Sequence, residues 1–309
     1  MSQIANTVQP MDVSQTTSQT TTSQPATRHT DQKFYKVLKV DLVHYGFKYA
    51  LGLNEDHLPF NPSGTCQPGG LYYTTAEHIP AFLSLGKLIA EVEPKGQIYA
   101  DPEGKKWKTD KLYVHSIRSV REWLSVQNES VQLAAIKINP FNIQYIDDPS
   151  EAVQLKAVTC FGMTLQCIAK PTYAVQLAAV KTAGQAIKYI NNPTEELQLI
   201  SVEQLGNNID CIGVPTSEKV QIKAVSQNGN AIRLIYNPSD AVKLAAVITD
   251  GWAIEFIKDP TEDMQLIAIN KNHSLFRYIK KPTELVVQTA RKLAEEARII
   301  RINAAQSMS

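Results

Sequence analysis

The sequence predicts a small α+β domain followed by an all-α solenoid of about eight 22-residue units, each built from two short helices. The first observation behind this prediction is a set of prolines at intervals of 22 or 23 residues, each followed by Ser or Thr. The second is a helix-like apolar run after each proline, with a glycine midway through most units. A fixed period of this length is typical of stacked repeats. The prolines are Pro149, Pro171, Pro193, Pro215, Pro238, Pro260 and Pro282.

Composition divides the chain into three segments. Residues 1–32 are rich in Ser, Thr and Gln and predict a disordered tail, because they cannot bury enough apolar surface to offset their chain entropy. Residues 33–118 form the predicted α+β domain, and residues 119–309 form the repeat array. Residues 127–148 lack the repeat proline and glycine and are expected to be a degenerate first unit. The segment after Pro282 predicts a longer capping helix with a charged face.

Short apolar runs bounded by Gly and Pro predict the strands of the N-terminal domain. They cover residues 34–40, 69–75, 88–94 and 111–117. Between the second and third runs, residues 74–86 predict a short helix. A domain of roughly 85 residues is small, and we expect it to fold with support from its neighbour.

The unit that begins at Pro193 illustrates the predicted repeat. Thr194 is expected to cap the first helix by accepting a hydrogen bond from a first-turn amide, and Glu195 lies where the helix dipole favours an acid. Gly206 is expected to end this helix in the left-handed conformation, and Ile212 to anchor the second helix. The same roles are assigned to Gly162, Gly184, Gly229 and Gly251, and to Ile168, Ile190, Ile235, Ile257 and Ile279.

A glutamine recurs at one position of the first helix, inside the apolar sector of a helical wheel. Because a buried amide needs partners, we expect each glutamine to bond backbone groups of its own or the next repeat. The resulting hypothesis is a structural ladder that ties the inter-repeat loops, and the alternative is a polar track for a ligand. Lys243 interrupts the row. The glutamines are Gln132, Gln154, Gln176, Gln198, Gln221 and Gln265.

Charge, hydropathy and cysteine spacing disfavour several classes of function. The formal net charge is +1, so no global field attracts nucleic acid or an anionic membrane. No apolar run is long enough to span a bilayer, and the first residues lack a signal-peptide pattern, so we expect no membrane insertion. The cysteines form no CxxC pair, which favours free thiols in a reducing compartment, with no metal and no cofactor. They are Cys66, Cys160, Cys167 and Cys211.

The variable positions of the second helices are expected to face outward and to form the binding surface of the array. Their side chains alternate in sign without a basic stripe or interleaved aromatic rings, which disfavours nucleic acid binding by the array. Another protein is the usual ligand of such a surface. Trp252 is a candidate hot spot, with a packing role as the alternative. The candidate residues are Gln166, Lys188, Asp210, Arg233, Trp252, Glu255 and Arg277.

Three segments of the N-terminal domain resemble a domain found in proteins of giant DNA viruses of amoebae. They are residues 44–60, 64–79 and 101–112, and the likeness covers about residues 34–118. In those viruses the domain commonly precedes ankyrin or other helical repeats. The array is similar to a repeat family of unknown function in large viruses and bacteria. The resemblance implies a viral origin and a location in the host cytoplasm or in the virion.

A second resemblance is to ADP-ribosyltransferases. The segment GGLYYTTAEHIPAF is similar to the part of that fold that stacks nicotinamide on a tyrosine, so Tyr72 or Tyr73 is the matching position. His44 is a further candidate for a nucleotide pocket. The chain departs from the family in that residues 34–40 contain neither His nor Arg and that Asp110, rather than Glu, lies near the last strand.

The sequence lacks the P-loop, HExxH, GxSxG, GxGxxG and kinase signatures. We therefore predict a non-enzymatic protein-interaction or structural scaffold of viral origin, either a virion component or a host-directed adaptor, whose partner is a viral or host protein. The alternative is a degenerate ADP-ribosyltransferase-like or nucleotide-binding N-terminal domain that the array directs to its target.

Overall fold

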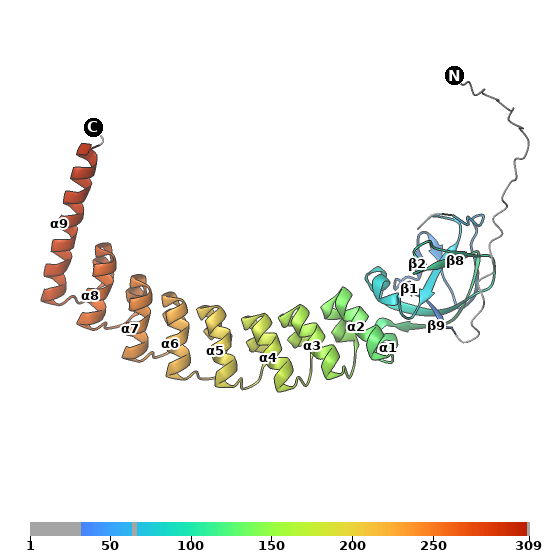
Figure 1. The fold of residues 1–309 in the computed structure, drawn as a ribbon, viewed down its shortest axis with the longest axis horizontal. Helices are drawn as coiled ribbons and strands as arrows, with labels where there is room; N and C mark the ends of the chain where they lie inside the picture. Colours follow the sequence, from blue (N-terminus) through green and yellow to red (C-terminus); the bar gives the residue numbers. More distant parts are fainter. Residues whose placement is uncertain (1–31, 64–66, 308–309) are drawn as a thin grey trace, which may run out of the picture. The chain divides into compact units, whose positions relative to one another are not determined.

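The computed structural model describes residues 32–63 and 67–307. The predicted disordered tail, apart from its last residue, and Cys66 lie outside these residues. In the described part, a sheet-rich region is followed by a run of α-helices that alternate with 3-10 helices (Figure 1). This confirms the predicted order of a region containing a sheet and an array of helical repeats.

The N-terminal region is built on a seven-stranded antiparallel sheet with strand order β4-β9-β6-β1-β5-β8-β7. Strands β2 and β3 form a separate hairpin. The strands are β1 (Phe34–Leu38), β2 (Val43–His44), β3 (Phe47–Lys48), β4 (Gly52–Glu55), β5 (Leu71–Thr75), β6 (Leu88–Pro94), β7 (Ile98–Ala100), β8 (Trp107–Thr109) and β9 (Lys111–Ser119).

The four predicted strands correspond to β1, β5, β6 and β9. The other five strands were not predicted, because they are two to four residues long and lie in segments that Gly and Pro interrupt. The helix predicted over 74–86 is a 3-10 helix, η1 (Ile79–Leu85). It starts later than predicted because the chain remains extended in β5 as far as Thr75.

Side chains of the central strand β1 enter two different cores, since successive residues of a strand face opposite sides of the sheet. Tyr35 and Val37 pack with η1 and with the first helices of the array. The rings of Tyr35 and Trp123 meet edge to face at 5.3 Å between centroids. On the other face, Leu38 packs with Leu71 inside the N-terminal region. The sheet therefore covers the first end of the apolar core of the array.

In the array, every α-helix from α2 to α8 is followed by a six-residue 3-10 helix and packs against the α-helix of the next unit (Figure 1). The α-helices are α1 (Val120–Leu124), α2 (Glu129–Ile138), α3 (Glu151–Cys160), α4 (Tyr173–Thr182), α5 (Glu195–Gln204), α6 (Glu218–Gln227), α7 (Asp240–Thr249), α8 (Glu262–Lys271) and α9 (Glu284–Ser307). The 3-10 helices are η2 (Pro140–Tyr145), η3 (Gly162–Cys167), η4 (Gly184–Tyr189), η5 (Gly206–Cys211), η6 (Gly229–Leu234), η7 (Gly251–Phe256) and η8 (His273–Tyr278).

The Ser or Thr that caps each first helix also connects neighbouring repeats. Thr194 Oγ1 accepts a hydrogen bond from the amide of Leu197, as the sequence predicts. In several repeats the hydroxyl also donates to the first-turn glutamate of the preceding repeat, as Ser217 does to Glu195 at 2.5 Å. The other pairs of this kind are Ser150 with Glu129, Thr172 with Glu151, and Ser239 with Glu218. These charge-assisted bonds couple successive units.

The prediction that the repeat glycines end the first helix in the left-handed conformation is wrong. None of the five repeat glycines, all of which the structure describes, has a positive φ. Leu205 caps α5 in an extended conformation, and Gly206 begins the 3-10 helix. A Cβ atom on Gly206 would lie 2.3 Å from the carbonyl oxygen of Ala224 in the next repeat. The glycine is therefore required by a close approach between repeats. The left-handed residues of the described array are Asn192, Asn237 and Asp259.

The isoleucines assigned to anchor the second helix lie one residue beyond the 3-10 helices. Ile212, for example, is the extended C-cap of η5, and the buried hydrophobic side chain within that helix belongs to Ile209. Five of the six isoleucines are buried, and Ile235 is half-buried. They fill the core at the turn toward the next unit.

We expect Gly206→Ala to destabilise the protein by about 1–3 kcal/mol, because the added methyl group overlaps a backbone carbonyl that cannot turn away. Gly213→Ala is the matched control, since no atom lies within 4 Å of a Cβ at that position. Urea unfolding of both variants checks the prediction. Equal unfolding midpoints would show that no close approach exists at Gly206.

Candidate functional site

All six candidate residues on the predicted binding surface of the array, and Gln166 beside them, are exposed. They lie on consecutive 3-10 helices from η3 to η8. Each 3-10 helix from η3 to η8 contributes one such side chain at its fifth residue, so the row has the period of the repeat. We call these positions, together with Trp252, the charged row.

A second row, which the sequence analysis missed, lies directly beside the first. It consists of the last residue of each 3-10 helix from η2 to η8, and in four of these seven helices that residue is aromatic. The ammonium group of Lys188 lies 5.0 Å from the ring centre of Tyr189, and the guanidinium of Arg277 lies 4.8 Å from that of Tyr278. Trp252 is 40% exposed and meets Tyr278 edge to face at 5.5 Å. The second row consists of Tyr145, Cys167, Tyr189, Cys211, Leu234, Phe256 and Tyr278.

The repeated glutamines point toward the loop that begins their own repeat. In all six, Nε2 donates to the carbonyl oxygen of the residue five positions earlier, at 2.9–3.2 Å. In most repeats that residue is the repeat proline. Gln265 also donates to the carbonyl of Lys281 in the next loop at 3.4 Å. Buried Oε1 atoms of Gln154 and Gln265 have no partner among the described residues. We propose that the glutamines close the loop of each repeat.

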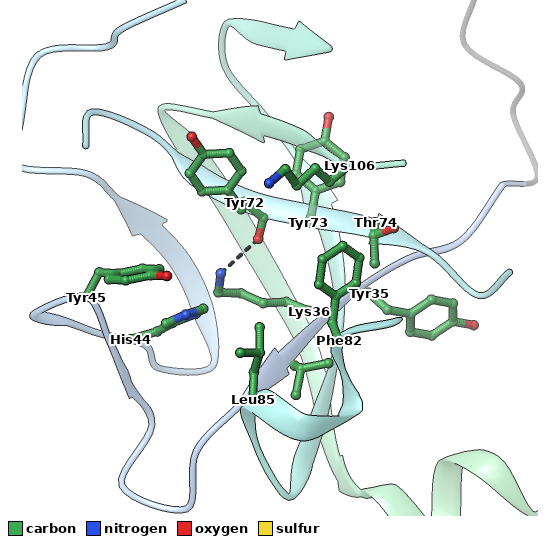
Figure 2. A pocket seen from close by; sticks show the side chains of 11 residues that line it. Tyr35, Lys36, His44, Tyr45, Tyr72, Tyr73, Thr74, Phe82, Leu85 and Lys106 are labelled. Carbon is green, nitrogen blue, oxygen red and sulfur yellow. Dashed lines mark hydrogen bonds between the residues drawn. The ribbon is translucent and has the colours of Figure 1, made fainter. Parts of the chain in front are cut away.

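The N-terminal region contains two adjoining cavities beside the central strand β1 and the hairpin of β2 and β3. Their volumes are about 80 and 240 Å³, and both are lined by Lys36, His44, Tyr45 and Tyr72. Lys36 projects from the central strand β1, and Tyr72 from the neighbouring β5. His44 ends β2, and Tyr45 lies in the turn of the hairpin. Figure 2 shows the amine of Lys36 between the side chain of His44 and the backbone of Tyr72.

Lys36 occupies a core position of the sheet. Only 5% of its surface is exposed, and Nζ donates to the carbonyl oxygen of Tyr72 at 2.8 Å. The same nitrogen lies 4.7 Å from the ring centre of Tyr49. Burial lowers the pKa of this amine to about 7, because the charged form loses its hydration. The alternation of β1 could have revealed the site, since Lys36 lies on the same face as Leu38.

The hairpin of β2 and β3 presents two more side chains at the cavities. Tyr45 and Gly46 both have positive φ, as a tight two-residue hairpin turn requires, and this conformation is strained for a tyrosine. The rings of His44 and Tyr45 stack at 4.5 Å. Burial, and then the nearby charges of Lys36 and Lys39, lower the pKa of His44 to about 4. The imidazole is therefore neutral at pH 7.

The structure brings the candidates for a nucleotide pocket, Tyr72, Tyr73 and His44, to the lining of one cavity (Figure 2). Tyr73 is 3% exposed and packs against Phe34 and Trp107, so most of its ring belongs to the core. No glutamate lines either cavity, and Asp56 is the acid that does. Both oxygens of that carboxylate accept backbone amides, those of Leu58 and Gly70.

No group of three or more His, Cys, Asp or Glu side chains within residues 32–63 and 67–307 is arranged to hold a metal ion. The three cysteines that the structure describes are free thiols. Among the described helices, none combines the length and the apolar character needed to cross a bilayer.

We expect Gln198→Leu to destabilise the protein by about 1–3 kcal/mol, because the buried carbonyl of Pro193 would lose its donor. Lys243→Gln is the paired variant, since Lys243 occupies the same repeat position and donates to Asp240 instead. It should be neutral or slightly stabilising. Thermal and urea unfolding measure both changes, and a leucine variant as stable as the natural protein would contradict the loop-closing role.

Lys36→Met should change the pH dependence of stability. Because the pKa of Lys36 is lowered in the folded state, the unfolded chain binds more protons between about pH 7 and pH 10.5, and the natural protein gains stability as pH rises through this window. Methionine does not titrate. The stability of the variant relative to the natural protein should therefore fall by roughly 2–4 kcal/mol from pH 7 to pH 10.5. Urea unfolding across this range measures the difference, and a constant difference would contradict the lowered pKa of Lys36 in the folded protein.

Comparisons with known proteins find a similarity to a viral repeat protein. No family model matches the chain, and no solved structure matches it. Over 102 residues the chain is 28% identical to R868, a protein of Acanthamoeba polyphaga mimivirus whose name describes it as an ankyrin repeat protein. The alignment covers 31% of this chain and 51% of the mimivirus protein, so the chain spans about half the length of the relative it matches. The chain is thus a repeat protein with similarity to a protein of a giant virus.

Proposed function

We propose that the protein binds another protein through the charged row and the second row of its array. The observation that carries this proposal is the regular presentation of one polar or charged side chain and one neighbouring side chain, often aromatic, on each 3-10 helix. Tyrosine, tryptophan and arginine are the residue types that contribute most to protein interfaces. Repeat arrays use such extended surfaces for protein partners.

The relative in the giant virus adds to this proposal. Its name describes an ankyrin repeat protein, and repeats of that kind bind proteins. The units of this chain are 22 residues long, whereas ankyrin repeats have a period of about 33 residues, so the proposal concerns the class of partner and not the architecture of the repeat. We propose a viral scaffold or host-directed adaptor that acts in the virion or in the cytoplasm of the host.

The charge pattern favours a protein over a nucleic acid as the partner of the array. Along the charged row, Lys188 is followed by Asp210, Arg233, Glu255 and then Arg277. Binding to the phosphate backbone of a nucleic acid needs several cations that no nearby acid opposes. In this row each acidic side chain weakens the attraction of its basic neighbours for phosphate. A protein surface with alternating charges of the opposite sign complements this row.

Removing the basic side chains of the charged row should weaken partner binding. We expect the triple variant Lys188→Ala, Arg233→Ala, Arg277→Ala to bind its partner at least tenfold more weakly. The reason is that arginines at the centre of an interface each contribute about 1–2 kcal/mol. The measurement is quantitative mass spectrometry of proteins captured on the immobilised chain from infected amoebal extracts treated with nuclease.

The matched control replaces three exposed lysines of the α-helices, in the variant Lys156→Ala, Lys181→Ala, Lys271→Ala. A partner retained by the natural protein and the control, and lost by the row variant, supports the proposal. Retention of the same partners by all three proteins would place the binding surface elsewhere. Capture that occurs in a parallel extract without nuclease, and not in the treated extract, would contradict a protein partner.

A further inference from the structure

The amine of Lys36 is buried with little compensation. An ammonium group offers three hydrogen-bond donors, and the one acceptor that the described residues provide at hydrogen-bond distance is the carbonyl oxygen of Tyr72. No carboxylate pairs with Lys36 in the described part of the chain. A buried charge of this kind is costly, so the neutral amine is favoured. Figure 2 shows the side chain of Lys36 among the residues that line the smaller cavity.

The ionisable groups around this amine do little to restore its charge. His44 faces it from β2 and is neutral at pH 7 because its own pKa is lowered to about 4. Lys106, which also lines the smaller cavity, adds a second basic group. Asp56 and His57 line the larger cavity, and the Asp56 carboxylate is bonded to backbone amides of its own loop. The remaining ionisable groups of the lining are tyrosines.

The cavities suit a small ligand with an apolar or aromatic group. Val37, Phe82 and Leu85 line the smaller cavity beside Tyr35 and Tyr73. The larger cavity adds Phe47 and Tyr49. Volumes of about 80 and 240 Å³ accept a compound built around one ring and are small for a dinucleotide. A neutral amine in such an environment is the arrangement that lysines use to react with carbonyl groups.

We propose that Lys36 is a nucleophilic amine that binds small aldehydes or ketones covalently, as an imine, in the cavity beneath Tyr45 and Tyr72. The lone pair of Nζ attacks the carbonyl carbon, a C–N bond forms, and the electrons of the C=O bond move to oxygen. A proton passes from nitrogen to that oxygen. The resulting carbinolamine loses its hydroxyl group and a proton as water when the C=N bond forms. The reaction is a condensation and needs no oxidant or reductant.

His44 has a position suited to the proton transfers of this reaction. Its neutral imidazole lines both cavities beside the amine, and it can accept a proton at one ring nitrogen and release one from the other (Figure 2). The hydroxyl group of Tyr72 donates to the carbonyl of Gln67 at 3.1 Å, which fixes the ring at the border of the larger cavity. The aromatic walls thus hold the ligand while the amine reacts.

The experiment is reductive trapping with benzaldehyde and cyanoborohydride on the full chain at pH 7, followed by peptide mapping. Hydride reduces each imine to a stable benzylamine, so the labelled lysines report where imines form. Lys39 serves as the internal reference, because it is an exposed lysine just beyond the same strand. Because burial lowers the pKa of Lys36 to about 7, about half of this lysine carries a free amine at pH 7, and we expect it to be labelled at least tenfold faster than Lys39. The α-amino group is read separately from its own peptide.

Two variants separate reactivity from binding in the cavity. The main product of the reaction should be the chain that carries one benzyl group, at Lys36. Lys36→Met should abolish this product, whereas Lys39→Met should leave its amount unchanged. Leu85→Trp, a change at a half-exposed residue of the cavity wall, should fill the smaller cavity and slow labelling of Lys36 at least fivefold while the lysine stays in place.

The pH profile provides a readout that does not depend on any variant. The ratio of Lys36 labelling to Lys39 labelling should fall as the pH rises from 7 toward 10, because burial has already lowered the pKa of Lys36 to about 7. Labelling of Lys36 no faster than that of Lys39 would overturn the proposal. So would labelling of Lys36 that the Leu85→Trp change leaves unaffected, because the cavity would then have no part in it.

Discussion

The array depends on the close approach of each repeat to the next, which is possible because the five 3-10 helices from η3 to η7 begin with glycine. At Gly206 the space for a side chain is taken by the carbonyl oxygen of Ala224, and Gly162 and Gly229 face the carbonyls of Ala179 and Ala246 in the same way. The alanines at the facing positions are fully buried. Small residues on both sides let the backbones approach, so each unit can bury its apolar side chains against its neighbour.

This spacing determines where the polar contacts and the exposed rows lie. One period brings the cap hydroxyl of a repeat within hydrogen-bond distance of the first-turn glutamate of the preceding repeat, as in Ser217 and Glu195. Where Ser201 replaces the usual alanine, its hydroxyl donates to the carbonyl of Gly184 at 2.8 Å and remains fully buried. The same period repeats the exposed end of every 3-10 helix, which produces the charged row and the second row.

The N-terminal sheet serves two purposes through a single strand. One face of β1 closes the core of the array with Tyr35, which packs on Trp123. The other face holds Lys36 above the cavities. A strand fixed at the centre of a seven-stranded sheet positions the amine more rigidly than a loop would. Buried polar atoms without partners in the described chain, such as Trp123 Nε1, occur at this junction and in the glutamine row.

The sequence predicted local features well and contacts between distant residues poorly. The proline period, the cap at Thr194 and strand β6 were all visible in the sequence, because each depends on a few neighbouring residues. The role of Gly206 was predicted wrongly. The local sequence does not show whether a glycine is needed for a positive φ or for close contact with the next repeat. The glutamate contacts one repeat away and the second row were missed for the same reason. Lys36 was overlooked because its significance comes from cavities that four separate strands enclose.

The most direct test of the repeat spacing is the removal of one complete unit. Deleting residues 171–192 should leave neighbouring repeats in the same register. The shortened protein should therefore unfold in one cooperative urea transition, and its unfolding free energy should depend less steeply on urea concentration, in proportion to the lost unit. Deleting residues 171–181 removes half a unit and serves as the comparison, since it brings unlike positions together. Loss of cooperative unfolding in the 22-residue deletion, or equal tolerance of both deletions, would contradict an array held together by a contact that recurs once per period.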